Sequence, residues 1–306
     1  MQTSLLQENL CHNLPQVRGQ YSFNYSLKKL NWFQVGGTCD VLFKPEDIED
    51  LAYFIKNKPK DLPVYILGAG SNMLVRDGGI QGCCIKLGRA FSNIEIKDNR
   101  VAVGASCLDR TLVMTCAENG LSGLDFLVGV PGSIGGAVAM NAGAYGYEIK
   151  NYLKWVKIVD VHGDIIVLND AAEHMQYRRG NIAKGSIIVE ACFELEHLDK
   201  DLILKKVDSY LQLRNESQPT KGKMGGSTFK NPASSPLKAW ELIDQAGCRG
   251  FAINDAVMSE KHCNFMMNQG DATSEDLEKL GDEVISRVKQ KTGIDLEWEI
   301  IRIGRK

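Results

Sequence analysis

The stretch from Pro131 to Gly146 constrains the fold of this chain most, because its glycines and alanines leave the backbone almost bare. It reads PGSIGGA over residues 131–137 and MNAGAYG over residues 140–146. Glycine adopts positive φ angles easily, so consecutive N–H groups can converge and hold anionic oxygens. Earlier in the chain lies another loop, GAGSNML at residues 68–74, which is the first glycine loop, residues 131–146 being the second. It follows an apolar run at residues 64–67 that predicts a strand. Two such loops indicate a cofactor that carries a diphosphate.

A Rossmann dinucleotide fold is the first alternative, but the loop at residues 68–74 does not fit it. That fold needs G-x-G-x-x-G at the start of a long helix and an acidic residue about twenty positions later. Here Met73 occupies the third glycine position, and the cluster from Asp77 to Gly79 breaks a helix. Each loop alone also remains compatible with ordinary tight turns.

Composition narrows the class of protein. The 306 residues predict two or three domains with a substantial core, and the net charge of −2 argues against a nucleic-acid surface. The nine cysteines are odd in number and scattered, with no C-x-x-C pair, a pattern typical of proteins in a reducing compartment. The five histidines are not spaced as metal ligands usually are. We therefore expect small-molecule partners and no metal.

No apolar stretch approaches the length of a membrane span, and the beginning of the chain has Glu8 and no basic start. These features predict a soluble, cytoplasmic protein without a secretory signal.

The hydrophobic pattern predicts an α+β fold built with hairpins rather than regular crossovers. The expected hairpins join residues 93–97 to 100–103 and 156–161 to 164–168. Further strands are expected at 64–67, 186–195, 264–267 and 296–303, and helices at 47–57, 108–118, 201–215, 236–245 and 274–291. We place the last domain boundary just before residue 201.

Ser227 is the first of three polar residues that stand out as candidates for chemistry. It follows two glycines, so the main chain can approach a ligand there, and Lys230 and Asn231 lie within reach of an anion. The alternative is a loop serine that bonds its own backbone.

Glu299 and Arg178 are the other two candidates. Strand alternation puts Glu299 on one face with Ile301 and Ile303, where burial would raise the pKa of its carboxyl and suit it to proton donation or to pairing with an enolate. The guanidinium of Arg178 matches a carboxylate or enolate oxygen pair. An exposed edge glutamate and a surface ion-pairing arginine are the alternatives.

Taken together, these motifs resemble the UDP-N-acetylenolpyruvoylglucosamine reductases. The resemblance runs through most of the chain, in the motifs NWFQVGG at 31–37, GAGSNML at 68–74, GVPGSIGGA at 129–137, MNAGAYG at 140–146, Tyr177-Arg178, GSTFKNP at 226–232, GCRG at 247–250 and LEWE at 296–299. Each motif is weak alone, whereas their shared order is specific.

The resemblance implies noncovalent FAD bound between two N-terminal subdomains, residues 1–90 and 91–200, of the vanillyl-alcohol oxidase and p-cresol methylhydroxylase type. A substrate domain at residues 201–306 follows, with its terminal strand returning to the active site. By similarity, the cofactor is held by Gly68, Ala69, Gly70, Ser71, Asn72, Met73, Gly132, Ser133, Ile134, Gly135, Gly136, Asn141, Ala142 and Gly143.

The family reaction is also implied by the resemblance. NADPH reduces the flavin, and the flavin passes a hydride to C3 of the enolpyruvyl ether of a nucleotide sugar in peptidoglycan synthesis. Arg178 and Glu299 match the residues that stabilise the enolate, and Ser227 matches the proton donor to C2. Tyr177, Lys230 and Asn231 are candidate substrate ligands. No obligate protein partner is implied.

Two positions depart from the family pattern: Gly180, where serine is common, and Gln34, where arginine is common. The short connection after Arg178 resembles the shorter subclass, which lacks a tyrosine-bearing insertion. An oxidase of the same fold remains an alternative, although no histidine lies between Cys39 and Gly146 to tether a flavin. A flavin or nucleotide-sugar binder without activity is a further alternative, which the trio of Arg178, Ser227 and Glu299 disfavours.

Overall fold

The computed structural model describes residues 13–306, so the expectation that rests on Glu8 lies outside the described residues. The chain forms two compact units, each assembled from separated segments. Unit 1 holds the described residues up to Tyr25, then Asp40–Ala69 and Gly82–Leu211. Unit 2 holds Ser26–Cys39, Gly70–Gln81 and Gln212–Lys306. The division into three domains at residues 90 and 200 stays a prediction.

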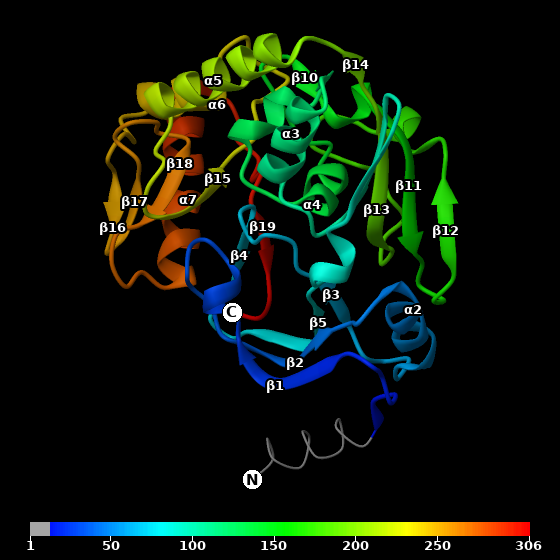
Figure 1. The fold of residues 1–306 in the computed structure, drawn as a ribbon. Helices are drawn as coiled ribbons and strands as arrows, with labels where there is room; N and C mark the ends of the chain where they lie inside the picture. The colour runs from blue at the N-terminus through cyan, green and yellow to red at the C-terminus, as the bar shows by residue number, and fades with distance from the viewer. Residues whose placement is uncertain (1–12) are drawn as a thin grey trace. The chain divides into compact units, whose positions relative to one another are not determined.

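A four-stranded sheet lies mostly in unit 1, with the order β1 (Gln20–Ser26), β2 (Thr38–Lys44), β5 (Ile80–Ile85) and β3 (Val64–Ile66) (Figure 1). Helix α2 (Ile48–Asn57) packs on it through Phe54, whose ring centroid is 4.5 Å from that of Phe43 in β2. The helix begins where the Asp47 carboxylate accepts a hydrogen bond from the Asp50 N–H, as is common at N-caps. The predicted helix at 47–57 is thereby confirmed.

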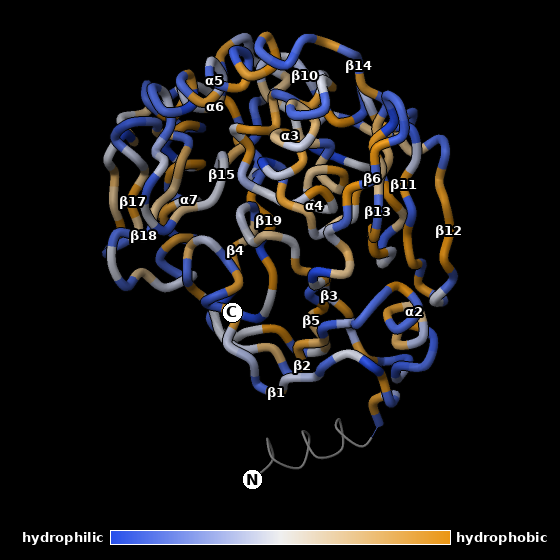
Figure 2. The backbone as a smooth tube through the Cα atoms, in the orientation of Figure 1, coloured by the Kyte–Doolittle hydropathy of each residue, from blue (hydrophilic) through white to orange (hydrophobic). Residues whose placement is uncertain are grey.

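A five-stranded antiparallel sheet forms the rest of the unit 1 framework. Its order is β12 (Ile165–Leu168), β11 (Leu153–Val159), β13 (Ile187–Glu194), β7 (Arg100–Gly104) and β6 (Ile94–Lys97). This confirms both predicted hairpins and the strand expected at 186–195. Apolar residues continue onto the edge strand β12 (Figure 2), where Ile165 is 45% exposed.

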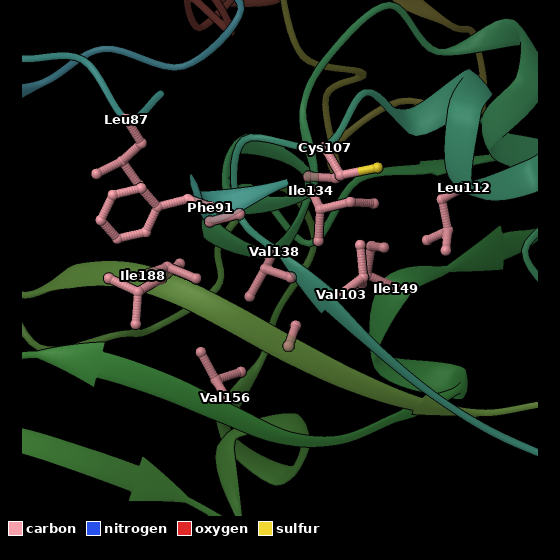
Figure 3. Packing of buried hydrophobic residues seen from close by; sticks show 14 of the residues in the cluster. Leu87, Phe91, Val103, Cys107, Leu112, Ile134, Val138, Ile149, Val156 and Ile188 are labelled. Carbon is pink, nitrogen blue, oxygen red and sulfur yellow. The ribbon is translucent and has the colours of Figure 1, made fainter. Parts of the chain in front are cut away.

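Two helices share a buried core with this sheet, and the second of them begins in a glycine-rich segment. Helix α3 (Asp109–Glu118) confirms the helix predicted at 108–118, and α4 (Ile134–Ala139) begins within the glycine-rich turn and includes Gly135 and Gly136. Ile134 and Val138 of α4 lie among buried sheet residues such as Val103 (Figure 3). Burying this apolar face is the main force that holds α4 in place.

Short elements complete unit 1. Two-residue pairings join β8 (Leu121–Ser122) to β14 (Glu196–His197) and β9 (Gly143–Ala144) to β10 (Tyr147–Glu148). Single 3-10 turns occur at η2 (Arg89–Phe91), η3 (Asp125–Gly129), η4 (Ile149–Asn151) and η5 (Ala171–His174). Helix α5 (Lys200–Ser217) begins in unit 1 and ends in unit 2.

Unit 2 is built on the antiparallel sheet β15 (Lys223–Ser227), β18 (Phe265–Asn268), β17 (Ala256–Met258) and β16 (Ala252–Ile253). The unit also contains η1 (Leu27–Leu30), α6 (Ala239–Gln245) and α7 (Ser274–Thr292). A capping box begins α7, since Thr273 Oγ1 accepts from the Asp276 N–H at 3.1 Å and Asp276 Oδ2 accepts from the Thr273 N–H at 2.9 Å. Gly293, at φ 74°, ends the helix.

Two element predictions are corrected. Helix α6 begins at Ala239 instead of 236, because the Ala239 N–H donates to Asn231 Oδ1, 3.0 Å away, at the helix start. The strand expected at 296–303 shrinks to β19 (Ile301–Ile303), which pairs in parallel with β4 (Met73–Val75). The residues before it make a separate antiparallel contact in which Trp298 bridges Phe229.

Within residues 13–306, none of the helices has the length and apolar character needed to cross a bilayer. Over the same residues, no group of three or more His, Cys, Asp or Glu side chains is placed to hold a metal ion.

Candidate active site

Backbone hydrogen bonds connect the glycine-rich turn at residues 131–136 to the segment that precedes α3. The N–H groups of Ile134 and Gly135 donate to the carbonyls of Cys107 and Ala105, each at 2.9 Å. Ser133 forms an antiparallel bridge with Leu108. The N–H groups of Ile134 and Gly135 are therefore engaged, so any anion at this turn must be met by other backbone groups.

Two glycines of the second glycine loop have close neighbours. A Cβ at Gly132 would lie 2.5 Å from Asp109 Oδ2, and one at Gly135 would lie 2.9 Å from the Ala105 Cβ. A side chain at either position would collide with its neighbour, so the backbone stays bare at Gly132 and Gly135.

The unit 1 parts of the two glycine loops lie next to one another. A Cβ at Gly68 would meet Ser133 Oγ at 3.2 Å, and the carbonyl of Gly68 accepts a hydrogen bond from Lys86 Nζ. Burial lowers the pKa of the Lys86 ammonium. A bare backbone beside a lysine fits a diphosphate-bearing cofactor such as FAD. Sequence reasoning missed Lys86, because only pairing of β5 with β3 brings it beside residue 68.

The remainder of the first loop is ordered within unit 2. Gly70, at φ 78°, offers its carbonyl to the Trp32 N–H at 3.0 Å. Asn72 Nδ2 donates to the Glu299 carbonyl at 3.2 Å, and the Asn72 carbonyl accepts from the Ile301 N–H at 3.1 Å. The side chain of Asn72 therefore fixes the backbone beside Glu299.

Asn141 ties the second glycine loop together from inside. Its side chain is fully buried, donates to Glu148 Oε2 and to the Gln176 carbonyl, each at 3.0 Å, and accepts from the Lys150 N–H at 3.1 Å. The amide thus supports the loop. A cofactor contact from Asn141, Ala142 or Gly143 stays a prediction.

Tyr177 and Arg178 occupy the tip of a tight turn closed by two backbone hydrogen bonds between Gln176 and Arg179. Arg178 has φ 56°, a conformation that side chains other than glycine adopt at a cost. Its guanidinium donates to the Gly143 carbonyl at 3.0 Å and lies 4.9 Å from the Tyr177 ring centroid. The turn therefore sets Arg178 against the MNAGAYG loop.

Gly180, one of the two departures, is explained by the same turn. Its N–H donates to the Ala139 carbonyl at 2.9 Å, and a Cβ there would collide with the Val138 carbonyl oxygen. Glycine is thus the residue that this backbone accepts. Gln34, the other departure, has φ 56°.

Ser227 and Glu299 are held by one short antiparallel contact in unit 2. The carbonyl of Thr228 accepts from the Glu299 N–H at 2.8 Å, and the Lys230 N–H donates to the Glu297 carbonyl at 2.8 Å. Ser227, the last residue of β15, is opposite Phe265 of β18. The two predicted catalytic residues therefore flank the isolated bridge between Phe229 and Trp298, Ser227 two residues before Phe229 and Glu299 directly after Trp298.

The predicted environment of Glu299 is partly wrong. Leu296 and Ile300 are buried, but Ile301, on the face assigned to Glu299, is 49% exposed. Alternation failed because the chain changes partner, from residues 228–230 to β4, between Glu299 and Ile301.

Lys230 and Asn231 have partners within unit 2. Lys230 Nζ lies 3.4 Å from Glu297 Oε2 in an ion pair whose carboxylate is 77% exposed, a pair too open to fix the lysine strongly. Asn231 Oδ1 accepts from the Ala239 N–H. Their roles as substrate ligands stay predictions.

Comparison with known proteins identifies the family. The FAD binding domain family matches residues 39–169, and the C-terminal domain family of UDP-N-acetylenolpyruvoylglucosamine reductase matches residues 218–303. The reductase of Rickettsia massiliae is 49% identical over 292 residues, which cover 95% of this chain and 98% of the relative. This chain belongs to the UDP-N-acetylenolpyruvoylglucosamine reductase family. The reductase of Rickettsia canadensis is 47% identical over 293 residues, again covering 95% and 98%.

A solved structure of the reductase from Thermus caldophilus agrees with the fold, with a TM-score of 0.80 and 32% identity. It covers 94% of this chain and all of that one. The predicted α+β class, with an FAD-binding part and a C-terminal reductase domain, is thereby confirmed. Assignment to the shorter subclass stays a prediction.

Proposed function

We propose that this reductase-family protein reduces the enolpyruvyl double bond of UDP-N-acetylglucosamine enolpyruvate to give UDP-N-acetylmuramate, a peptidoglycan precursor. FAD is its cofactor and NADPH its hydride donor. Similarity to named reductases over 95% of the chain supports the activity. The backbone contact that joins the segments of Ser227 and Glu299 carries the assignment of roles.

Bound FAD would supply two-electron chemistry, taking a hydride from NADPH and giving one to C3 of the substrate. Gly68, Gly132 and Gly136 would offer their bare backbones to its diphosphate, and Lys86 would supply positive charge beside Gly68. A hydride at C3 and a proton at C2 complete the reduction of the double bond.

Arg178 and Glu299 would stabilise the charge that develops at the substrate carboxylate. As hydride reaches C3, negative charge spreads from C2 onto the carboxylate oxygens, and the planar guanidinium of Arg178 matches that oxygen pair. The bond from Arg178 to Gly143 orients this group before substrate binds, which lowers the cost of reorganisation.

Ser227 would give its hydroxyl proton to C2. A serine is a weak acid in water, but a carbanion-like carbon is a strong base, so the transfer is favourable once the geometry is fixed. Ser227 is half-buried at the end of β15, where the Thr228 N–H donates to the Asn264 carbonyl at 2.8 Å and limits movement of the backbone. Tyr177, Lys230 and Asn231 would contact the rest of the nucleotide sugar.

We also propose that the protein acts in the cytoplasm, because NADPH and nucleotide sugars are made there.

An anaerobic titration of the flavin absorbance tests the activity. NADPH should bleach the flavin, and UDP-N-acetylglucosamine enolpyruvate should restore its colour. Bleaching that only air reverses would instead indicate an oxidase. A purified protein that takes up no FAD would overturn the proposal.

Ser227→Ala tests the role of the serine. Reduction of the flavin by NADPH should stay within twofold, while reoxidation by substrate should slow by at least about a hundredfold, the range general acids supply. Ser234→Ala, an exposed serine of the same segment, is the matched control and should leave both rates unchanged. Equal slowing of both halves would contradict the role.

A further inference from the structure

Asp109, the first residue of α3, carries a buried carboxyl without a hydrogen-bond partner. Its side chain is 1% exposed, and among the described residues neither carboxyl oxygen meets a donor. Two other buried aspartates of unit 1 differ in this respect. Asp50 accepts from the Gly19 N–H at 2.9 Å, and Asp125 accepts from Ser122 Oγ at 2.6 Å. An unpaired buried carboxylate is costly, so Asp109 calls for another explanation.

The carboxyl lies directly against the second glycine loop. The added Cβ at Gly132 would be 2.5 Å from Asp109 Oδ2, and the Asp109 N–H donates to the Gly132 carbonyl at 3.3 Å. The carboxyl therefore packs on a turn that the proposed function assigns to the cofactor diphosphate.

The groups around Asp109 do not neutralise a negative charge. Residues 131–136 contain no titratable side chain, and Arg110 is exposed. Cys107, on the preceding segment, is buried, and the pKa of its thiol is raised to about 11 by burial and by Asp109. Cys107, Leu112 and Ile134 belong to one cluster of buried apolar side chains on the segments that flank Asp109 and on α4 (Figure 3).

Burial raises the pKa of the Asp109 carboxyl to about 8, so at neutral pH it holds a proton. A neutral carboxyl can lie behind an anion-binding turn without repelling the anion. Once ionised, it would place a negative charge one glycine away from a diphosphate, in surroundings that screen the charge poorly.

We propose that Asp109 is a positioning residue of the cofactor loop, whose neutral carboxyl permits tight FAD binding and whose ionisation releases FAD. This inference rests on the proposed function, because it takes residues 131–136 as part of the cofactor site. Proton and cofactor binding are then linked, so FAD affinity falls as the pH rises above about 8.

The experiment measures the Kd for FAD on flavin-stripped protein between pH 6.5 and 9.5 at fixed ionic strength, by quenching of flavin fluorescence. For the unaltered protein, Kd should be constant up to about pH 7.5 and should then rise by about tenfold by pH 9.5. Asp109→Asn keeps the shape without the charge, and its Kd should stay low and flat. Asp125→Asn is the matched control and should keep the rise.

A second measurement needs no variant. Calorimetry of FAD binding at pH 8.5, in two buffers of different ionisation enthalpy, should detect net proton uptake on binding. A parallel rise of Kd in Asp109→Asn and the unaltered protein, or binding without proton uptake, would overturn the inference while leaving the proposed function intact. Failure to bind FAD at pH 6.5 would overturn both.

Discussion

Gly281, in the middle of α7, should control catalysis although it lies outside the segments of Ser227 and Glu299. A Cβ at this position would fall on the Cζ2 and Cη2 atoms of Trp298, the residue before Glu299. The Trp298 ring has other close neighbours, since its centroid lies 5.2 Å from that of Phe229 and 4.5 Å from the Arg302 guanidinium carbon. Gly281→Ala must therefore displace the indole, and with it the backbone of Glu299.

The expected magnitudes separate stability from activity. Alanine improves the helix by about 1 kcal/mol, while overpacking a core costs about 1–3 kcal/mol, so the variant should lose no more than about 2 kcal/mol of unfolding free energy. A displacement of the reacting groups of about 1 Å can cost about a hundredfold in rate. We therefore expect Gly281→Ala to fold and to slow the second half-reaction by about ten- to a hundredfold.

Stopped-flow absorbance of the flavin measures both halves separately. Gln290→Ala, an exposed position on the same helix, is the control and should leave both rates unchanged. Adding Trp298→Phe to Gly281→Ala removes the ring atoms in collision and should restore part of the lost stability. An unchanged second half-reaction in Gly281→Ala, or equal slowing of both halves, would refute the reasoning.

Three further predictions concern stability and are measured by urea unfolding. The pKa of the Asp109 carboxyl is about 8 in the folded protein, whereas an unfolded aspartate has a pKa near 3.9. The unfolding free energy should therefore fall as the pH rises from about 4 to 8 and should then level off. Asp109→Asn should remove this pH dependence of the unfolding free energy. Glu278→Gln should cost about 3–5 kcal/mol, because the 9%-exposed carboxylate pairs with Arg76 at 2.9 Å, and a cost below 1 kcal/mol would show that the pair is dispensable. Gly180→Ser should destabilise by about 1–3 kcal/mol through its collision with the Val138 carbonyl, and a neutral result would mean that the turn can shift.

The sequence predicted most of the elements, because periodicity and caps are local signals. The capping box of Thr273 and Asp276 and the hairpin on either side of Asp98 and Asn99 could be placed to within a residue or two. The strand at the end of the chain could not, because its pairing depends on residues far away in the sequence. Strand alternation assumes that a strand pairs with one neighbour along its whole length, whereas residues 297–303 pair first with residues 228–230 and then with β4.

Sequence motifs predicted the glycine loops and the candidate catalytic residues, but they did not predict the residues that pack against these loops. Nothing local to Lys86 or Asp109 connects them with glycine loops, since strand pairing and the bridge between Leu108 and Ser133 bring them there. Asn141 shows the opposite case. Its motif suggests a cofactor contact, yet its side chain is used to hold the loop.

The parallel pairing of β4 with β19 has a consequence for the order of events during synthesis. Ribosomes deliver the chain from its N-terminus, and domains tend to fold as they emerge. Strand β4 emerges early, at the end of the first glycine loop, but its partner Ile301–Ile303 emerges only after the whole of α7. Residues 70–75 must therefore wait for their native pairing while most of the protein is translated. A nascent chain of this protein is then expected to gain a complete first glycine loop late, close to its release from the ribosome.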